Sequence, residues 1–452
     1  MSEAAVTFRS ANGNANKLQP QDRAVHNWYR FVLSFPPHLV RDYLTRFGIG
    51  AGQTVLDPFC GTGTVLVECK KRGLASIGLE PNPMAYFASS VKLDWTPAPA
   101  GLMEHARRVG ERAVARLRSE GLEDTPFFET HPRPKAALRT LPEASCKLLL
   151  KDSISPLPLH KTLVLLEALR ESEDKRYQRH ELLALARALT SSIGNLHFGP
   201  EVGVGPPKTD ASVVSAWLAA VRSMTDDLRI LGKHDEVPSR VLLADARRLD
   251  EVLEPASVGA VITSPPYPNE KDYTRTTRLE SVLLGFIRDR HDLRSLKQGL
   301  VRSNTRNVYK EDDDDRWVAD HPGIQRIAGA IERRRVELGK TSGFERLYPR
   351  VTKLYFGGMS RHLAGLRQVL RPGAHLAYVV GDQASYLRVM IRTGQLLADI
   401  GQSLGYELVG IDLFRTRRAT ATRADLREEV VVLRWPGGRP KAGSGRAGMG
   451  RR

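Results

Sequence analysis

The chain has 452 residues, and 41% of them are apolar, which fits one large or two smaller globular domains. No apolar run approaches the length of a membrane span, which excludes an integral membrane protein. Lys and Arg total 68 against 51 Asp and Glu, and the net charge of +17 favours nucleic acid as a partner, although charge carried only for solubility gives the same count. The three cysteines form no CxxC pair and support neither a disulfide framework nor a zinc site. Few cysteines and an N-terminus without an apolar signal core predict a cytoplasmic protein.

The two ends of the chain differ in composition from the rest. Residues 1–20 are rich in Ala, Asn and Ser, and residues 436–452 are rich in Gly, Arg and Lys. Such segments bury too little apolar surface to fold alone. We therefore expect a disordered N-terminus and a flexible basic tail.

Between these ends, strand and helix patterns alternate. Short apolar runs predict strands at residues 54–57, 75–80, 241–245, 258–263, 375–380, 407–414 and 429–435. Helical patterns occupy residues 64–72, 395–404 and 354–370, the last ending at the breaker Arg371-Pro372-Gly373. This alternation predicts an α/β fold with a doubly wound, mostly parallel sheet. The two last strands in succession predict a terminal antiparallel hairpin.

Two stretches interrupt this alternation. Residues 96–236 are largely helical and basic, and residues 285–350 are rich in Arg, Lys and Asp. We expect one α/β domain, formed by residues 21–95 and 237–435, that carries both stretches as insertions. Either insertion is a candidate for substrate recognition. The acidic run 311–315 predicts a solvated loop, and the 12 histidines show no ligand spacing, so we expect no metal ion.

The first candidate site is a glycine turn between a predicted strand and a predicted helix. Residues 57–64 read Asp-Pro-Phe-Cys-Gly-Thr-Gly-Thr, and the glycines allow a tight turn with close backbone approach to a ligand. A purely structural turn would also fit this short pattern. Glu80, at the end of the next strand, is placed to reach ribose hydroxyls, with Asn82 beside it. Asp245 either accepts a hydrogen bond from an adenine amine or caps the segment that follows it.

The second candidate site is the run Thr263-Ser264-Pro265-Pro266-Tyr267, which follows a buried apolar strand. Open α/β sheets bind ligands at the carboxyl ends of their strands. The Ser264 hydroxyl and the Pro265 carbonyl can accept both hydrogens of an exocyclic amine, while Tyr267 stacks on its base. Pro266 stiffens the turn. A proline-rich strand terminator is the structural alternative.

Together the two motifs resemble the S-adenosylmethionine-dependent DNA amino-methyltransferases, which modify cytosine N4 or adenine N6. Residues 31–40 are similar to the N-terminal cofactor motif of that family. The resemblance implies a seven-stranded, Rossmann-like methyltransferase sheet with S-adenosylmethionine as cofactor. It makes Ser264, Pro265, Pro266 and Tyr267 catalytic. With the strand positions above, the cofactor-binding candidates are Ser34, Phe35, Asp57, Pro58, Phe59, Cys60, Gly61, Thr62, Gly63, Thr64, Glu80, Asn82 and Asp245.

The Ser-Pro-Pro-Tyr form resembles the cytosine-N4 branch more than the Asp-Pro-Pro-Tyr form typical of adenine-N6 enzymes. The resemblance implies a site-specific methyltransferase that acts on cytosine N4 in double-stranded DNA, in a restriction-modification setting with a companion endonuclease. Because the amine is hidden in a duplex, the base must flip out before in-line transfer. Adenine-N6 methylation is the near alternative. An RNA methyltransferase would be expected to carry an RNA-binding module, and the intact motif argues against a non-catalytic DNA-binding module.

Two loops are candidates for holding the substrate. Asn269, Lys271, Asp272 and Tyr273 follow the second motif and are placed to hold the flipped base or its phosphate. A later basic, hydroxyl-rich loop is placed to grip phosphates and contains Arg415, Arg417, Arg418 and Arg423. Ordinary solvated loops are the alternative for both.

Overall fold

The computed structural model describes residues 18–31, 34–125, 137–198, 202–231, 236–269, 271–418 and 425–438. Most of the segment expected to be disordered and most of the basic tail lie outside these residues. Arg423 also lies outside them, and so does the side chain of Arg418.

The centre of the molecule is a seven-stranded sheet in the order β5-β2-β1-β6-β7-β9-β8. Its strands are β1 (Thr54–Asp57), β2 (Ala75–Leu79), β5 (Ser239–Leu242), β6 (Val258–Thr263), β7 (Leu370–Gly381), β8 (Glu407–Arg418) and β9 (Asp425–Arg434). All pairs are parallel except those of β9, which lies antiparallel between β7 and β8. The predicted doubly wound sheet and its terminal hairpin are therefore confirmed. The strand order reverses between β1 and β6, the crevice where such sheets bind ligands.

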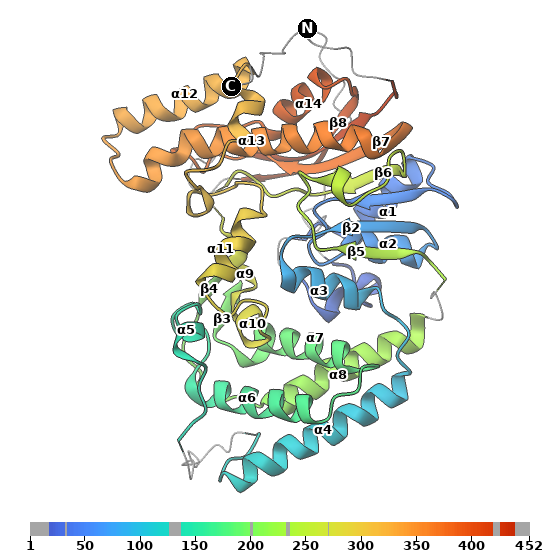
Figure 1. Cartoon of the computed structure of the whole chain (residues 1–452), viewed down its shortest axis with the longest axis vertical. Helices are drawn as coiled ribbons and strands as arrows, with labels where there is room; N and C mark the ends of the chain where they lie inside the picture. The colour runs from blue at the N-terminus through green and yellow to red at the C-terminus, as the bar shows by residue number, and fades with distance from the viewer. Residues whose placement is uncertain are drawn as a thin grey trace, which may run out of the picture.

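Alternate residues of the central strands face two different helical layers (Figure 1). Val55 and Ile262 contact α1 (Pro37–Arg46) and α2 (Thr64–Lys71) on one face. Leu56 and Val261 lie in the core formed with the other layer. The helices of that layer are α12 (Pro322–Glu337), α13 (Gly343–Val369) and α14 (Thr393–Ser403). Because successive side chains of a strand point to opposite faces of the sheet, each apolar run contributes to two cores.

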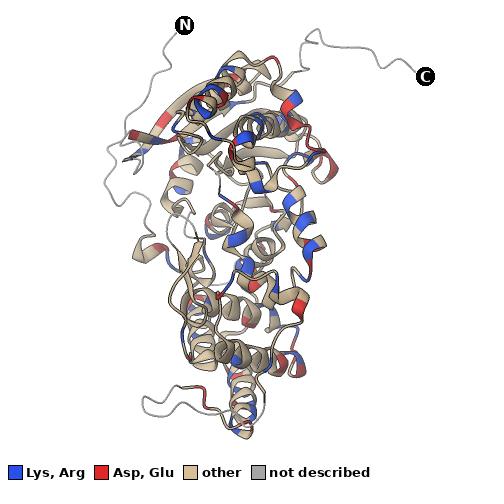
Figure 2. Ribbon diagram, turned by 90° about the vertical axis from the view of Figure 1, so that its left-hand side faces the viewer, with Lys and Arg blue, Asp and Glu red and all other residues tan. Residues whose placement is uncertain are grey.

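The stretch expected to be helical does form a helical layer, below the sheet in Figure 1. It follows α3 (Pro83–Lys92) and precedes β5. Its elements are α4 (Pro99–Ser119), α5 (Glu143–Cys146), α6 (Pro156–Glu171), α7 (Gln178–Ala188), the π-helix η3 (Leu189–Ile193), the hairpin β3 (Leu196–Phe198) and β4 (Val202–Val204), and α8 (Val213–Leu231). Figure 2 shows Lys and Arg residues along the ribbon of this layer as well as around the sheet.

Smaller elements connect these layers. They are the 3₁₀ turns η1 (Pro20–Asp22), η2 (His26–Trp28), η4 (Leu249–Glu251), η5 (Thr305–Asn307) and η6 (Asp314–Val318), and the helices α9 (Tyr273–Thr276), α10 (Arg278–Leu283) and α11 (Arg290–Gln298). The stretch 285–350 contains α11, η5, η6, α12 and the first turns of α13. Its helix α11 contacts the helical layer, where Leu296 shares a small core with Leu148, whereas η6, α12 and α13 pack together beside the sheet.

Three local predictions were wrong. The strand expected at 241–245 lies at Ser239–Leu242, since the chain leaves the sheet at the exposed Leu243. The helix expected from 354 begins at Gly343, where Ser342 caps it, and it continues through Pro349. The strand expected at 375–380 already begins at Leu370, so Arg371-Pro372-Gly373 lies within β7, although the preceding helix ends at Val369, within one residue of its predicted limit.

The acidic run 311–315 is not a solvated loop. Asp314 is buried and forms ion pairs with Arg247 and Arg361, and Asp312 pairs with Arg302. Glu311 and Asp313 are exposed, so the run alternates between inward and outward carboxylates. Charge density along the sequence could not show which carboxylates have a guanidinium opposite them.

Candidate active site

The glycine turn lies between the end of β1 and the start of α2. Gly61 and Gly63 have φ angles of 51° and 82°, a region that favours glycine. A Cβ on Gly63 would lie 3.0 Å from the Cβ of Ser89 on α3. The loop therefore needs glycine for its backbone conformation and for the close approach of α3, and it leaves the N-terminus of α2 at the ligand-binding edge of the sheet.

Asp57 joins the glycine turn to the second motif. Its Oδ1 accepts hydrogen bonds from the Thr263 hydroxyl at 2.6 Å and from the Phe59 N–H at 3.2 Å. Its Oδ2 is buried and has no hydrogen-bond partner among the described residues. Burial raises the pKa of Asp57 to about 7, against the effect of the two hydrogen bonds. A buried acceptor without a donor is suited to a cationic or hydrogen-bonding ligand.

Glu80 holds the same turn from the next strand. One carboxylate oxygen accepts from Gly61 N–H at 2.9 Å, and the other accepts from Asn82 N–H at 2.8 Å. Asn82 in turn caps α3 by accepting from Met84 N–H. Burial raises the pKa of Glu80 to about 7. Each oxygen keeps a lone pair for a further donor.

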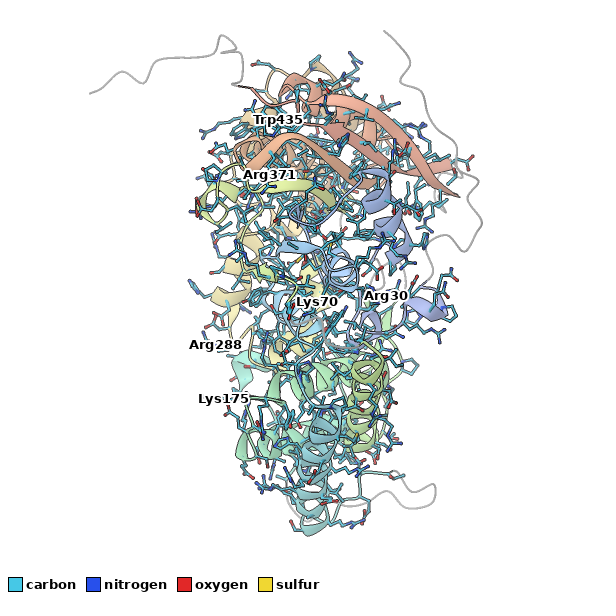
Figure 3. All side chains as sticks on the ribbon, turned by 90° about the vertical axis from the view of Figure 1, so that its right-hand side faces the viewer. Arg30, Lys70, Lys175, Arg288, Arg371 and Trp435 are labelled. Carbon is cyan, nitrogen blue, oxygen red and sulfur yellow. The ribbon has the colours of Figure 1, made fainter. Side chains whose placement is uncertain are left out.

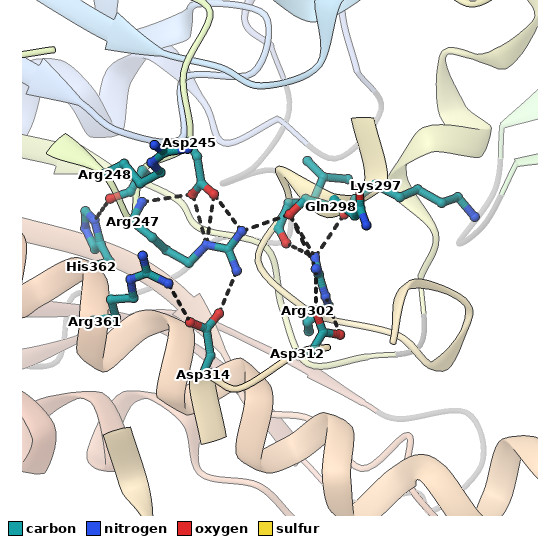
Figure 4. A network of polar contacts seen from close by, with 12 residues as sticks. Asp245, Arg247, Arg248, Lys297, Gln298, Arg302, Asp312, Asp314, Arg361 and His362 are labelled. Atoms are coloured by element: carbon teal, nitrogen blue, oxygen red, sulfur yellow. Dashed lines mark hydrogen bonds and ion pairs between the residues drawn. The ribbon is translucent and has the colours of Figure 1, made fainter. Parts of the chain in front are cut away.

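Asp245 lies beyond the end of β5 in a network of buried charges (Figure 4). Its carboxylate pairs with Arg247 at 2.6 Å, and Arg247 pairs with Asp314 at the same distance. The alternative prediction, that Asp245 caps the segment after it, holds in part, because its Oδ1 accepts from the Arg247 N–H at 2.9 Å, although the next helical element, η4, begins only at Leu249. The adenine contact stays a prediction.

The second motif leaves β6 beside the carboxyl end of β7. The Ser264 hydroxyl donates to the Val379 carbonyl at 3.1 Å, which leaves the Ser264 lone pairs as acceptors. The Tyr267 N–H donates to the Tyr273 hydroxyl at 3.3 Å. The Tyr267 ring lies 3.1 Å from where a Cβ on Gly381 would stand, and burial raises the pKa of its hydroxyl.

The N-terminal motif covers the glycine turn with a residue that was not a candidate. The Phe31 ring lies 3.7 Å from the position of a Cβ on Gly61, and the Ser34 hydroxyl donates to the Phe31 carbonyl at 3.0 Å. Phe35 instead packs against the core of α1. The structure thus brings Phe31 to the glycine turn, with Ser34 bonded to its carbonyl, and the cofactor contacts of Ser34 and Phe35 stay predictions. The motif contains two aromatic residues, Phe31 and Phe35, and the sequence alone did not show which ring covers the glycine turn.

The candidate substrate residues lie in two places, which are the segment after the second motif and the strand β8. Tyr273 starts α9 and lies beneath Tyr267, whereas the Lys271 N–H donates to the side chain of Asn269 at 3.3 Å. Arg415 pairs with Glu428 at 2.9 Å, and Arg417 lies 3.7 Å from the same carboxylate. Glu428, which was not a candidate, contacts the Gly381 position beside Tyr267 and partly neutralises both arginines.

Known proteins share these features. A family model for DNA methylases of the N6/N4 class matches residues 10–89, which contain the glycine turn and Glu80. The type II methyltransferase M.BsoBI of Geobacillus stearothermophilus is 24% identical over 93% of this chain and 87% of its own length. M.AvaI of Nostoc is 23% identical over 96% of this chain and 90% of its own. These similarities support a DNA amino-methyltransferase of the N4/N6 family.

Methyltransferases of this family use S-adenosylmethionine as methyl donor, and type II DNA methyltransferases act on DNA. Among solved structures, the rRNA methyltransferase AviRa of Streptomyces viridochromogenes aligns with 94% of this chain and 97% of its own, at 12% identity and a TM-score of 0.32. Of the helices that the structure describes, none is long and apolar enough to cross a bilayer.

Proposed function

We propose that this methyltransferase modifies the exocyclic N4 amine of cytosine in double-stranded DNA. The observation that carries the proposal is Ser264 at the end of β6, with its hydroxyl hydrogen donated to Val379 and its lone pairs available. Ser-Pro-Pro-Tyr is the form that resembles the cytosine-N4 branch. Adenine N6 is the second candidate, since its amine has the same two hydrogens.

The chain's residues would prepare the amine for reaction. The nitrogen lone pair of such an amine is delocalised into the ring. When the Ser264 hydroxyl and the Pro265 carbonyl accept its hydrogens, the nitrogen becomes more pyramidal and positive charge growing on it is stabilised. Tyr267, held by Tyr273 and backed by Gly381, would stack on the flipped base. S-adenosylmethionine, when bound, supplies the electrophilic methyl group.

The glycine turn fits that cofactor. The buried Oδ2 of Asp57 has no donor among the described residues and would accept from the α-ammonium group. Gly61 and Gly63 let the backbone approach the ligand, and Glu80 would accept from the ribose hydroxyls with its remaining lone pairs. Asp245 would face the adenine. The proposed roles of Pro58, Phe59, Cys60, Thr62 and Thr64 follow from their place in the same turn.

The biological setting is also a proposal. M.BsoBI and M.AvaI are named type II methyltransferases. We infer that this chain likewise acts in the cytoplasm beside a companion restriction endonuclease. Residues 21–95 and 237–435 would form the catalytic domain, and 96–236 with 285–350 would be its insertions.

A labelling experiment tests the target base. The purified protein is incubated with tritiated S-adenosylmethionine and genomic DNA, and the DNA is hydrolysed to nucleosides. We expect the label in N4-methylcytosine. Label in N6-methyladenine would overturn the cytosine assignment, label confined to RNA would overturn DNA, and no transfer would favour a non-catalytic DNA-binding module.

Ser264→Ala tests the catalytic assignment. We expect at least a roughly 100-fold lower transfer rate at saturating donor, because one acceptor of the amine is lost. Ser403→Ala is the matched control, because its hydroxyl also donates to a backbone carbonyl, that of Ile400, but far along the chain from the motif. Equal rates for the two variants would show that Ser264 is not catalytic.

A further inference from the structure

Two half-buried arginines from distant parts of the sequence have no anionic partner. Arg30 precedes the N-terminal motif, and Arg187 lies in the last turn of α7. Neither guanidinium has a hydrogen bond or ion pair to a described residue. Most other half-buried arginines of the described chain do, for example Arg116 and Arg139 on the same helical insertion. A desolvated charge without a partner is costly, so its retention indicates a ligand.

A third cation lies beside them. Lys92, at the end of α3, is buried, and its ammonium group donates to the Thr62 carbonyl at 3.0 Å within the glycine turn. Burial, then the charges of Arg30 and Arg187, lower the pKa of Lys92 to about 7. Burial and the charge of Arg187 also lower the pKa of Arg30. The three groups are therefore close enough to repel one another.

The surrounding packing places this cluster at the active-site cleft. Phe31, next to Arg30, covers Gly61, and Lys92 lies under Thr62. α7 packs against α3, and η3, which continues α7, packs against α10 just after the catalytic loop. Figure 3 shows Arg30 at the level between the sheet and the helical insertion. Arg187 thus belongs to the helical insertion, and Arg30 belongs to the N-terminal segment whose Phe31 covers the glycine turn.

We propose that Arg30, Arg187 and Lys92 form an anion site that binds a backbone phosphate of the DNA next to the extruded nucleotide. Two guanidinium groups offer paired donors to phosphate oxygens, and a bound anion would favour the charged form of Lys92 at the glycine turn. The inference rests on DNA being the substrate.

The carboxylate of the proposed methyl donor is the alternative anion that the three cations could bind. S-adenosylmethionine carries an ammonium and a sulfonium besides that carboxylate, so its net charge is positive. Three clustered cations would oppose its binding, whereas a phosphodiester brings a negative charge alone. Asp57, with its buried Oδ2, is the group suited to the positive part of the donor. The charges therefore favour a DNA phosphate over the donor's carboxylate as the ligand of the three cations.

The test compares Arg187→Gln and Arg30→Gln with Arg170→Gln in the full-length protein. Arg170 is an exposed arginine on α6 of the same insertion, so its variant removes the same charge away from the cleft. DNA affinity is measured for a duplex at several salt concentrations, and donor affinity is measured by calorimetry. We expect each cleft variant to bind DNA roughly fivefold to tenfold more weakly, with a salt slope reduced by about one, and to bind the donor as the wild type does.

Two results would overturn this site. DNA binding and salt slope equal to those of Arg170→Gln would exclude a phosphate contact. Weakened donor binding with unchanged DNA binding would assign the cations to the donor's carboxylate instead. If the wild-type protein transfers no methyl group to DNA, the proposed function fails; if it does and the cleft variants match the control, only the phosphate site fails. Thermal unfolding of each variant shows whether it has folded.

Discussion

Asp57 and Glu80 are the two carboxylates that we propose to bind the methyl donor, and both are buried beside the same turn. Each has a pKa of about 7, raised chiefly by desolvation, whereas an exposed carboxyl titrates near pH 4. At each position the folded protein therefore binds a proton more tightly than the unfolded chain does. Their contribution to stability is present below about pH 4 and is lost as pH rises towards 7.

This titration predicts a pH-dependent donor affinity. Only ionised Asp57 can pair with the donor's ammonium group, so we expect affinity to increase from pH 6 to pH 8, by up to about tenfold per pH unit below the pKa. Calorimetric titrations across this range measure it. Asp57→Asn should weaken binding and flatten the profile, whereas Asp226→Asn, at an exposed position, should do neither. A rising profile that persists in Asp57→Asn would exclude Asp57 as the titrating group.

At the scale of elements, the contact between α13 and η6 holds the second insertion in place. The backbone of Gly357 approaches η6 so closely that a Cβ would stand 1.9 Å from the Asp314 carbonyl oxygen. Asp314 then reaches Arg247, which pairs with Asp245 near the predicted adenine site. One glycine on α13 is thus required for a buried charge network that ends at the donor site.

Gly357→Ala should therefore destabilise the protein strongly. We expect the free energy of unfolding to decrease by about 3 kcal/mol or more, because either η6 or α13 must move and the Arg247 pair is disturbed. Gly365→Ala is the matched control, since it lies on the same helix with no atom within 4 Å of an added Cβ. It should raise stability by about 0.5–1 kcal/mol. Chemical denaturation measures both changes, and similar values for the two variants would contradict the close approach.

Over the whole molecule, the helical insertion shares a hydrophobic core with the sheet domain. Met84 and Ala88 of α3 and Leu66 of α2 belong to the same buried cluster as Leu165 and Trp217 of the insertion. An insertion with a separate core could unfold by itself, but this one would lose part of its core if the sheet domain unfolded first.

Heat or denaturant should consequently unfold both parts together. We expect fluorescence and circular dichroism to report coincident transitions. Leu165→Ala, in the insertion, should lower the free energy of unfolding by about 2–5 kcal/mol. The unfolding transition should nevertheless remain single. A separate early transition in this variant would show that the insertion is an independent domain.

Much of this architecture could be predicted because it depends on neighbours in sequence. The strand Val258–Thr263 is a continuous apolar run ended by two prolines, and its predicted limits agree with those observed. The glycine turn is equally local, since φ at Gly61 and Gly63 and the start of α2 are encoded within a few residues. By contrast, α13 begins at Gly343 rather than at residue 354, and it continues through Pro349.

The sequence by itself determined the α/β class and the two motifs that carry the family resemblance, because periodicity and turn chemistry are properties of short segments. Only the tertiary structure decided which charges meet. It paired Asp314 with Arg247, placed Phe31 over Gly61, and brought Arg187 near Arg30 and Lys92. These contacts join residues far apart in the chain, and the free energy of a charge depends on what lies opposite it in space.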